Sequence, residues 1–489
     1  MRYFLGIDFG GGASKATLLS EEGKVVASST SEYSTTYTVG GGAEQNPDDW
    51  VLATVKNIKE LLSTSKVDAY DIAALCLDAA THTAVIMDEN FKVIRPAIYW
   101  TDTRSVAEVD YLKRDYGDLI LSETLHEPGT IWTLPELLWI RNNEPQNWGR
   151  VKRILFAKDY VRHALTGDYV TDYIEAEGSM LFNVKERVWS KNLCDILGLE
   201  VDLLPNIVSP TDIVGGISKD GAIISRLVEG TPVIAGTTDT AMEVLSAGAV
   251  FKGQMTLKLA TAGRICVITD KPYPHRDIVN YSHVGEGLYY PGTATKAAAS
   301  AYRWFRDSFS GDYAELDAAA SNIDIGCEGL VFHPYLNGEL TPYANPKLCA
   351  DFVGIRSHHT KAHFARAVLE GVAMSMLECK ILIDELGIEH TSRAAIIGGG
   401  GKSPLWRQMI ADALGIELVE MRYTDSSFGS ALLCAVALGA FDSLKDAVEC
   451  CNSIVSITTP NIENKEKYGH LFKKYKAVQK ALEPIYNNF

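Results

Sequence analysis

The chain has 489 residues and a formal net charge of −16 at pH 7, and 46% of its residues are hydrophobic. One hydrophobic core usually stops growing at about 250–300 residues, so this length predicts two domains. The acidic balance disfavours a broad nucleic-acid surface, because affinity for a polyanion depends on clustered lysine and arginine. No apolar run reaches the ~20 residues of a membrane helix. The N-terminus lacks a signal-peptide core, so we expect a cytoplasmic protein that binds neither nucleic acid nor membrane.

The first eighty residues predict an antiparallel meander followed by a helix and a buried strand. Three strands are expected at residues 3–9, 14–20 and 24–33. Asn46 and Pro47 are typical of a helix start, and the apolar residues from 50 to 62 follow helical spacing. The apolar run at 72–78 predicts a buried strand. A meander followed by alternating helix and strand predicts a mixed sheet covered by helices.

A similar pattern recurs in the second half of the chain. At 255–269, "MTLKLATAGRICVIT" again places a turn of small residues, Ala260 to Gly263, between two predicted strands. Helices are then expected at 361–387, 403–415 and 465–486, with a strand beginning at 393. The repetition predicts an α/β protein of two duplicated domains, 1–247 and 248–489, with a cleft between them.

The run "GIDFGGGASK" places three glycines between the first two strands. A glycine turn leaves backbone N–H groups bare of side chains, and such turns bind anions, phosphate above all. Lys15 adds a cation nearby. Asp8 ends the strand that faces the same turn, where a carboxylate suits Mg²⁺ or its waters. A simple hairpin turn is the alternative.

A second glycine run, Gly398 to Gly401, lies between a predicted strand and a predicted helix. A P-loop is excluded because Ile396 stands where its first glycine is required. The spacing also fits a Rossmann fingerprint poorly. We therefore favour a nucleotide-facing loop of another type, with a plain helix entry as the alternative.

Asp239 follows an apolar strand in "VIAGTTDTAMEVLSAGA". A carboxylate at a strand end is well placed as a general base, because its backbone is rigid while its side chain faces solvent. Asp239 could equally be a helix N-cap, since Thr237, Thr238 and Asp239 are all good capping residues.

Four further residues, His82, Trp100, Asp102 and Arg104, lie near the ends of two predicted strands. An aromatic face beside charged groups suits a polyhydroxylated ligand. Taken singly, the tryptophan could be core and the Asp–Arg pair a surface ion pair. The histidines of "SHHTKAH" are a weaker candidate for a zinc site, because Thr360 resembles a helix cap and no acidic ligand follows closely.

Six segments in order resemble the FGGY carbohydrate kinases of the actin and hexokinase-like ATPase superfamily, and the resemblance covers nearly the whole chain. They are "IDFGGGASKATLL", "GTIWTLPELLWIRNN", "GTTDTA", "LKLATAG", "ADFVGIRSHHTKAHFARAVLEG" and "IIGGGGKSPLWRQMIADALG". The resemblance implies a ribonuclease H-like fold in each domain, with sugar bound by the first domain and ATP by the second.

The resemblance also implies a role for individual residues. Asp239 would accept the proton of the sugar hydroxyl, and Asp8 would hold Mg²⁺ through water. The sugar would contact His82, Trp100, Asp102 and Asp239. The nucleotide and its phosphates would contact Gly10, Gly11, Gly12, Lys15, Thr261, Ala262, Gly263, Gly399, Gly400 and Ser403. Phosphoryl transfer depends mainly on positioning and charge neutralisation, which this set could supply.

The sequence departs from the family pattern at several positions. Hydroxyl-bearing residues or glycine are usual where Gly11, Ala260 and Ala262 stand, lysine where Glu136 stands, and arginine where Leu340 stands. The segments "LTGDYVTD" and "PYLNGELTP" resemble the xylulokinase branch most, so we expect a ketose substrate such as D-xylulose. Glycerol or another polyol, a non-catalytic sugar or nucleotide regulator, and an actin-like assembly ATPase are the alternatives, and the sequence leaves a homodimer open.

Overall fold

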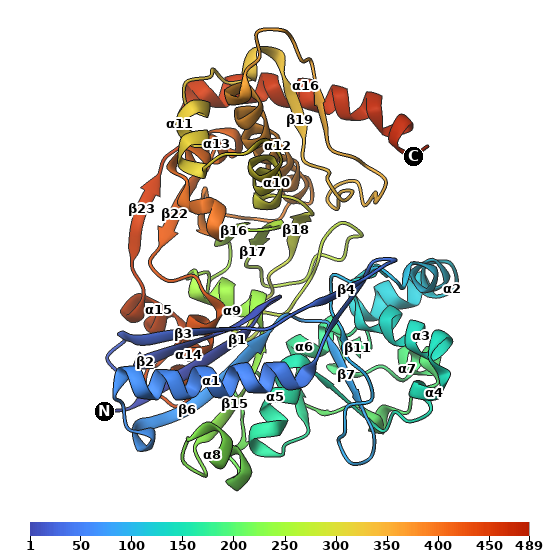
Figure 1. Ribbon diagram of the computed structural model, residues 1–489, viewed down its shortest axis with the longest axis vertical. Coiled ribbons are helices and arrows are strands. Elements are labelled where there is room, and N and C mark those ends of the chain that lie inside the picture. The colour runs from blue at the N-terminus through green and yellow to red at the C-terminus, as the bar shows by residue number, and fades with distance from the viewer. Residues whose placement is uncertain (489) are drawn as a thin grey trace. The chain divides into compact units, whose positions relative to one another are not determined.

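The computed structural model of the protein describes residues 1–488 and divides into two compact units (Figure 1). Unit 1 comprises Met1–Gly248, Tyr281–Glu286 and Tyr423–Asn452, and unit 2 comprises the remaining segments up to residue 488. Residues 281–286 and 423–452 lie in the second half of the sequence but belong to unit 1. Each unit contains one six-stranded mixed sheet flanked by helices, as the sequence predicts.

Unit 1 is built on the sheet β14-β15-β6-β1-β2-β3. Its strands are β1 (Tyr3–Phe9), β2 (Ala13–Ser20), β3 (Val25–Glu32), β6 (Ile72–Ala79), β14 (Ile213–Gly216) and β15 (Pro232–Thr238). The first three form the predicted antiparallel meander. Strands β6 and β15 continue the sheet in parallel with β1, and β14 closes it in the antiparallel direction.

Unit 2 repeats this topology. Its sheet has the order β18-β17-β16-β21-β22-β23, formed by Gly292–Thr295, Gly263–Val267, Met255–Leu259, Arg393–Ile397, Glu417–Met421 and Ile454–Thr458. The strands β16, β17 and β18 form a second meander. Strands β21 and β22 are parallel to β16, and β23 is antiparallel. The predicted duplication is therefore confirmed at the level of strand order and direction.

The remaining elements connect and cover these sheets. In unit 1 they are β4 (Thr36–Thr38), β5 (Gly42–Gln45), α1 (Pro47–Ser65), β7 (Ala84–Met87), β8 (Ala97–Ile98), α2 (Val106–Thr124), α3 (Thr133–Asn143), α4 (Pro145–Trp148), β9 (Arg153–Phe156), α5 (Ala157–Thr166), β10 (Val170–Asp172), α6 (Tyr173–Gly178), β11 (Phe182–Asn183), β12 (Val188–Trp189), α7 (Lys191–Leu197), β13 (Asn206–Val208), α8 (Lys219–Ser225), α9 (Asp239–Ser246), α14 (Ser426–Ala437) and α15 (Leu444–Cys451). In unit 2 they are α10 (Ala299–Phe309), α11 (Tyr313–Ala320), β19 (Val331–His333), β20 (Asp351–Val353), α12 (Lys361–Glu385), α13 (Pro404–Leu414) and α16 (Ile462–Tyr486). Short 3₁₀ turns lie at Ala69–Asp71, Val201–Leu203, Cys327–Gly329 and Gly399–Lys402.

Two helices pack on the two faces of β1 in unit 1. Residues Leu5, Ile7 and Phe9 share a buried core with Trp50 of α1, whose predicted N-cap, Asn46, is confirmed. The opposite face of β1 carries Gly6, where an added Cβ would lie 2.0 Å from the carbonyl oxygen of Ser427. That face is covered by α14, which Figure 1 shows beside β1 although the two are far apart in sequence.

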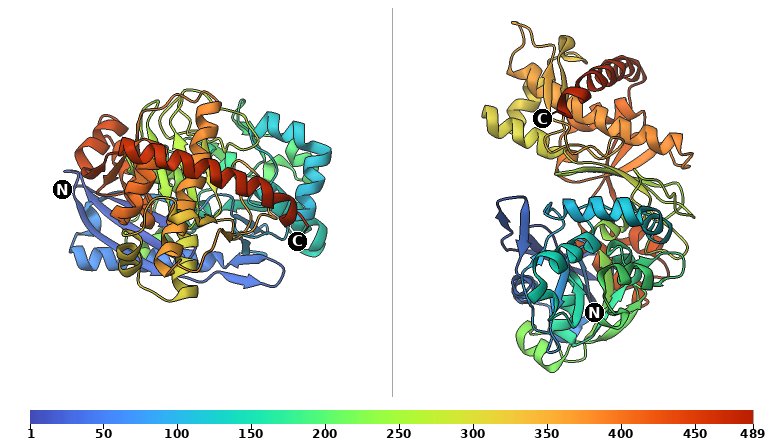
Figure 2. Two further views of the ribbon diagram at one scale, coloured as in Figure 1. Left: turned by 90° about the horizontal axis from the view of Figure 1, so that it is seen from above. Right: turned by 90° about the vertical axis from the view of Figure 1, so that its right-hand side faces the viewer.

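Helices α12, α13 and α16 pack together in unit 2 (Figure 2). All three lie where the sequence predicts helices. Thr360 is the N-cap of α12 and forms a capping box with His363, and Ser403 is the N-cap of α13. Gly415, with φ +68°, ends α13 in the left-handed conformation that favours glycine.

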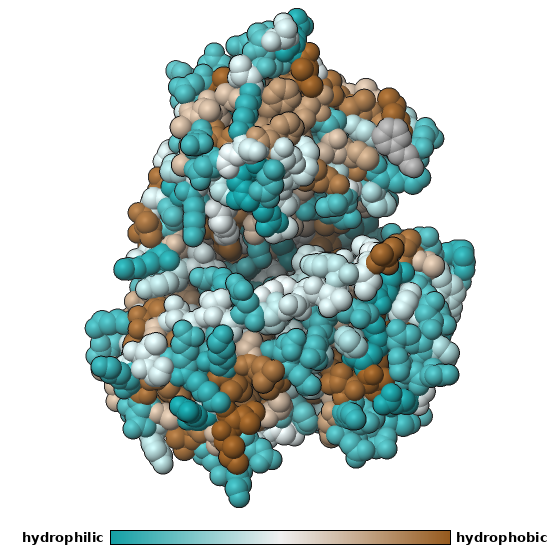
Figure 3. All heavy atoms as spheres, in the orientation of Figure 1, coloured by the Kyte–Doolittle hydropathy of each residue, from teal (hydrophilic) through white to brown (hydrophobic). Residues whose placement is uncertain are grey.

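The surface of the molecule is mixed in polarity (Figure 3). Apolar side chains gather around α8, where Ile223 is 69% and Ile224 36% exposed. No helix within residues 1–488 is long and apolar enough to cross a bilayer.

The close approach of α14 to β1 predicts that Gly6 tolerates no side chain. We expect Gly6→Ala to lower the free energy of unfolding by about 1–3 kcal/mol, because Ser427 belongs to the helix backbone and cannot move aside alone. Gly117→Ala in α2 is the matched control. An added Cβ there meets no atom within 4 Å, and alanine favours a helix over glycine by about 0.5–1 kcal/mol. Urea unfolding of both variants tests this, and equal effects would contradict it.

Candidate active site

Three aspartates lie at the carboxyl ends of three adjacent parallel strands in unit 1. Asp8 is the second-last residue of β1, and Asp78 is the second-last residue of β6 and directly opposite Asp8 in the register. Asp239 follows β15, whose residue Thr237 pairs with Asp78. Parallel strands carry their carboxyl ends to one edge of a sheet, which is where open α/β sheets usually bind ligands. The sequence singled out Asp8 and Asp239 but not Asp78.

Asp239 is not the N-cap of α9. That role belongs to Thr238, whose hydroxyl accepts the N–H of Ala241 at 3.3 Å. Asp239 is the first helical residue, is half-buried, and accepts the N–H of Thr240 on Oδ1 at 2.6 Å. Its other carboxylate oxygen has no such bond among the described residues. Asp239 is therefore fixed at the start of α9 by its helical backbone and by one hydrogen bond to its side chain.

Asp8 and Asp78 are buried side by side. Asp8 is 8% exposed and Asp78 0%. Burial raises the pKa of Asp8 to about 7, and the Asp239 carboxylate adds to this increase. Burial and the charge of Asp8 raise the pKa of Asp78 well above its usual range. Ser430 of α14 donates to Oδ2 of Asp78 at 2.5 Å.

The same pair of aspartates fits the Mg²⁺ ion that the sequence predicts. In residues 1–488, no N–H or O–H group donates to Oδ1 of Asp8 or to Oδ1 of Asp78. Carboxylate oxygens are the ligands that Mg²⁺ prefers, with one or two carboxylates, waters and substrate phosphates completing the shell. In that part of the chain, no group of three or more His, Cys, Asp or Glu side chains could hold a metal ion alone.

The predicted glycine turn connects β1 to β2 as a tight hairpin. Its carbonyl groups are tied back: Gly10 accepts the hydroxyl of Tyr33, and Gly11 accepts Thr35 Oγ1 at 2.8 Å and Gln45 Nε2 at 3.0 Å. Within the described chain the N–H groups of Gly11 and Gly12 donate to no protein acceptor. The turn therefore presents backbone donors outward, which is the arrangement that binds phosphate.

Lys15 forms an ion pair within unit 1. Its ammonium lies 2.9 Å from the carboxylate of Asp425, the residue before α14. Burial lowers the pKa of Lys15, but the bond to Asp425 more than offsets this, so the pKa is raised overall. Both side chains are about half exposed, so the ion pair contributes little to stability and can open toward an anion.

Gly11 is a glycine because Tyr99 occupies the adjoining space. A Cβ at position 11 would lie 2.8 Å from Tyr99 Oη, whereas the same atom at Gly12 has no neighbour closer than 3.9 Å. Tyr99 is 5% exposed, so the surrounding side chains restrict movement of its ring. The turn therefore adjoins the Tyr99 hydroxyl, and this contact favours glycine at position 11.

The second hairpin and the second glycine run lie together in unit 2. The hairpin joins β16 to β17, and the N–H groups of Ala298 and Ala299 bind the carbonyls of Thr261 and Ala260 at 2.9 and 2.7 Å. In residues 1–488 the N–H groups of Thr261 and Ala262 donate to no protein acceptor.

The 3₁₀ turn at Gly399–Lys402 packs on this hairpin. A Cβ at Gly398 or Gly400 would lie 2.8 or 2.9 Å from the carbonyl oxygen of Leu259, the last residue of β16. A Cβ at Gly399 would meet no atom within 4 Å. The close packing thus accounts for Gly398 and Gly400, while Gly399 borders open space. Ser403 is used otherwise, because its hydroxyl donates to Asp317 at 2.6 Å and caps α13.

His82 is held in a strained backbone conformation. Its φ is +74°, which is uncommon for a residue other than glycine. The carbonyl of His82 accepts Thr133 Oγ1 at 2.6 Å, and Nδ1 lies 2.8 Å from the carbonyl of Gly178, which assigns the ring proton to Nδ1. Nε2 then accepts the hydroxyl of Tyr281 at 3.2 Å. Strain that neighbours enforce is typical of functional sites.

An aromatic cluster surrounds His82 that the sequence did not indicate. The rings of Trp132 and Tyr281 lie 4.6 and 6.3 Å from the His82 ring, and His126 stacks on Trp132 at 4.3 Å. Such faces suit the C–H face of a sugar. Tyr281 belongs to the short segment 281–286 of unit 1, so only the fold brings it to His82.

Glu177 anchors that short segment. It lies in α6 and accepts the N–H of Ser282 at 2.8 Å and the hydroxyl of Ser282 at 2.6 Å. Burial raises the pKa of Glu177 to about 8, although the two bonds from Ser282 act in the opposite direction. The Glu177 carboxyl group, bonded to the residue after Tyr281, therefore binds its proton more tightly than a carboxyl group in water.

Trp100, Asp102 and Glu136 have different surroundings. Trp100 is 37% exposed, while Asp102 is buried and accepts the N–H of Ala43 at 2.6 Å and the Nε–H of Arg104 at 2.9 Å. Asp102 is thus tied into an ion pair. Glu136 is buried, and no donor in the described residues reaches its Oε1. Burial raises the pKa of Glu136 well above its usual range, and Asp102 adds to this.

The histidines near α12 form a cluster with an acid that the sequence did not reveal. Glu328 contacts His358 Nε2 at 2.9 Å and lies 3.8 Å from His363 Nε2. Nδ1 of His359 accepts the N–H of Arg356, and Nδ1 of His363 that of Thr360. Both rings therefore carry their proton on Nε2, which leaves no lone pair there for a metal.

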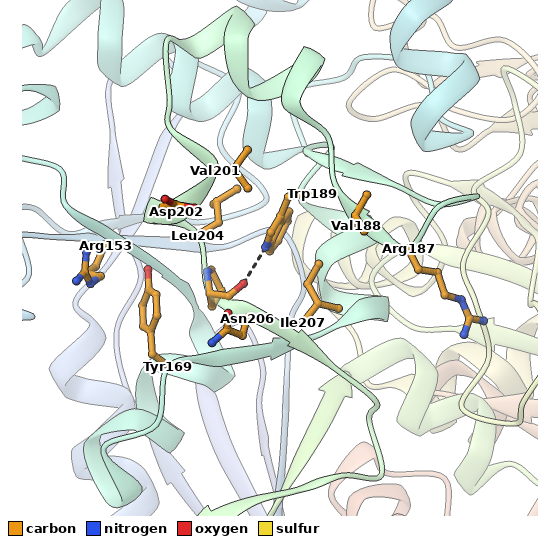
Figure 4. A pocket seen from close by; sticks show the side chains of 11 residues that line it. Arg153, Tyr169, Arg187, Val188, Trp189, Val201, Asp202, Leu204, Asn206 and Ile207 are labelled. Carbon is orange, nitrogen blue, oxygen red and sulfur yellow. Dashed lines mark hydrogen bonds between the residues drawn. The ribbon is translucent and has the colours of Figure 1, made fainter.

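A pocket of unit 1 lies away from these residues (Figure 4). It has a volume of ≈ 610 Å³ and is lined by residues between 153 and 207, none of which belongs to the predicted site. Arg153 and Tyr169 lie at one end, and Trp189 donates from Nε1 to the carbonyl of Pro205 at 2.7 Å.

Two family models match the chain. The N-terminal domain model of the FGGY family of carbohydrate kinases matches residues 3–246, and the C-terminal domain model matches residues 234–438. The chain belongs to the FGGY family. This confirms the resemblance that the six sequence segments indicate, and it identifies the protein as a sugar kinase of that family.

Known relatives differ in the sugar that their names give. The chain is 32% identical over 485 residues to the xylulose kinase of Bacillus subtilis (strain 168), which covers 98% of this chain and 97% of that one. It is 29% identical over 502 residues to the gluconokinase of Bacillus licheniformis, and the match covers 99% of this chain and 97% of the gluconokinase. A solved ligand-bound xylulose kinase from Lactobacillus acidophilus matches with a TM-score of 0.94 at 25% identity, covering 100% of both chains.

The contact between Gly11 and Tyr99 can be tested in a double-mutant cycle. We expect Gly11→Ala to lower the free energy of unfolding by about 1–3 kcal/mol, because the new Cβ overlaps Tyr99 Oη. Adding Tyr99→Phe removes that oxygen and should recover most of the loss. Gly12→Ala is the matched control and should cost less. If the changes in the free energy of unfolding caused by Gly11→Ala and Tyr99→Phe, measured by urea unfolding, simply add in the double variant, the two residues do not clash and the prediction is wrong.

The raised pKa of Glu177 predicts how stability depends on pH. A buried acid with a folded pKa of about 8 binds a proton more tightly in the folded than in the unfolded chain. Its contribution to the free energy of unfolding is complete below the unfolded pKa and falls as pH rises toward 8, by up to about 1.4 kcal/mol per pH unit. Glu177→Gln should flatten the profile between pH 5 and 8 measured by urea unfolding. Equal slopes in the two proteins would contradict this.

Proposed function

We propose that this FGGY kinase transfers the γ-phosphate of ATP to a hydroxyl of a ketose, D-xylulose or a related pentulose in particular. Two observations support the ketose: the sequence resembles the xylulokinase branch, and the relative that is 32% identical is a xylulose kinase. The single structural observation that carries the reaction is the carboxylate of Asp239, held rigidly at the strand ends beside Asp8.

In this proposal Asp239 is the catalytic base. Its backbone is fixed at the start of α9, and the bond from Thr240 N–H orients its Oδ1. The carboxylate accepts the proton of the sugar hydroxyl as that oxygen attacks phosphorus. Because this base is already fixed, substrate binding does not have to order it. Such prior positioning of the reacting groups supplies a large part of the rate increase in phosphoryl transfer.

The sugar lies against the aromatic cluster of unit 1. His82, Trp132 and Tyr281 provide faces for its C–H groups, and Trp100, partly exposed, provides another. Asp102 shapes this site through its ion pair with Arg104, since its oxygens are already occupied. Because the Asp102 carboxylate is already paired with Arg104, no unpaired cation remains among these described residues for a charged sugar acid.

The nucleotide is held by backbone groups. In unit 1 the N–H groups of Gly11 and Gly12 and the ammonium of Lys15 are suited to phosphate. Within unit 2, the N–H groups of Thr261 and Ala262 are suited to it in the same way. Gly399 and Gly400, next to this hairpin, would line the nucleotide. Backbone donors of this kind would let a chain of charge −16 hold an anionic ligand without side-chain hydroxyls at Gly11, Ala260 and Ala262. Mg²⁺, held near Asp8, neutralises phosphate charge when bound.

A coupled ADP-release assay with Mg-ATP tests this function. The panel contains D-xylulose, D-ribulose, D-gluconate, glycerol and a no-sugar control. We expect the highest kcat/KM with a pentulose, and Asp239→Asn should lower kcat by about 10²–10⁴-fold with little change in the KM for ATP. Asp270→Asn, an exposed residue paired with Lys252, is the control and should keep full activity. No stimulation by any compound would contradict the kinase, and a preference for gluconate or glycerol would contradict the pentulose.

A further inference from the structure

Asp78 is a buried charge that the proposed mechanism does not use. It lies on β6 with 0% exposure, directly opposite Asp8 of β1, and the two carboxyl groups lie within hydrogen-bonding reach of each other. Like charges opposite each other on neighbouring strands destabilise a sheet. A chain that retains such a pair in its interior must supply either a proton or a cation between the two groups.

The charged residues near Asp8 are mostly acidic. Besides burial, the negative charges of Asp239 and Glu243 raise the pKa of Asp8, and the ammonium of Lys15 is the one positive group seen to lower it among the described residues. The ammonium of Lys15 already contacts Asp425. Oδ1 of Asp8 and Oδ1 of Asp78 are both buried, and apart from the hydrogen bond that the two carboxyl groups can share, no donor in the described part of the chain reaches either. When the shared proton is absent, two adjacent carboxylate oxygens are an incomplete coordination shell for a hard divalent cation.

We propose that Asp78 is a second carboxylate for the divalent cation, which it holds together with Asp8. The inference rests on the proposed function, since it concerns the cation that accompanies ATP. It assigns a role to a residue that the resemblance to the family leaves without one. One or two carboxylates, completed by waters and substrate phosphates, are the usual protein contribution to a Mg²⁺ site.

Ser430 positions Asp78 for this role. Its hydroxyl donates to Oδ2 of Asp78 at 2.5 Å, while no other protein donor in the described residues reaches Oδ1. Ser430 comes from α14, the same helix that packs against Gly6 of β1. Carboxylates that bind metals are commonly held in this way by a hydrogen bond to the oxygen that is not coordinating.

Metal binding itself, rather than activity, tests the proposal. Mn²⁺ alone is titrated into the full-length protein without nucleotide or sugar, and free Mn²⁺ is followed by electron paramagnetic resonance. Wild type, Asp78→Asn, Asp78→Ser and the exposed control Asp270→Asn are compared. Thermal unfolding of each variant in EDTA establishes that it is folded, and we expect the Asp78 variants to melt at or above the wild-type temperature because a like-charge pair is removed.

We expect wild type and Asp270→Asn to bind one Mn²⁺ per chain, and both Asp78 variants to bind it at least about tenfold more weakly. Addition of Mg²⁺ should raise the melting temperature of wild type and shift the Asp78 variants less. Equal Mn²⁺ affinity in wild type and Asp78→Asn overturns the proposal in favour of a shared proton between the two carboxyls. Failure of wild type to bind Mn²⁺ also overturns it.

These outcomes are separate from those of the activity assay. Asp78-dependent Mn²⁺ binding in a protein that phosphorylates no sugar would refute the proposed function and leave the metal site in place. An active pentulose kinase whose Mn²⁺ affinity is unchanged by Asp78→Asn would support the proposed function and refute the role of Asp78 in metal binding.

Discussion

The parallel pairing of β1, β6 and β15 is the constraint on which the candidate site depends. Parallel strands bring their carboxyl ends to one edge, and here each of the three ends with or is followed by an aspartate. The register places Asp8 opposite Asp78, and Asp239 begins the helix after the third strand. No loop flexibility is needed to bring the acids together, so the site is as rigid as the sheet that carries it.

Helix α14 covers the face of β1 that carries Gly6, next to this edge. The helix lies so near β1 that only glycine fits at position 6, and it brings Ser430 to Asp78 and, just before its first turn, Asp425 to Lys15. One close contact between helix and strand thus sets two polar contacts of the site. The segment that carries α14 begins at residue 423, which explains why unit 1 includes a stretch from late in the sequence.

Local sequence patterns predicted the parts of the structure that local physics determines. The two meanders, the long helices and the position of Asp239 all follow from periodicity, capping residues and turns. Asp78 was missed because, within the run "IAALCLD", it looks like the polar end of a buried strand. Tyr281 and Glu177 were missed because their contacts join distant segments: Tyr281 and His82 are 199 residues apart, and Glu177 and Ser282 are 105 apart. No local pattern encodes such a pair.

Gly11 and Asp78 each lie against a residue from another part of the chain, Tyr99 and Ser430 respectively. Gly11 lacks the usual hydroxyl, but its place adjoins the hydroxyl of Tyr99, and the two cannot coexist with a larger residue at the turn. Asp78 adds a charge that the sheet alone would not tolerate, and the cost is met if a cation is shared with Asp8. Under the proposed function, both features serve one requirement, which is to neutralise and orient phosphate in an acidic protein. Lys15 alone would meet it incompletely, because its ammonium is shared with Asp425.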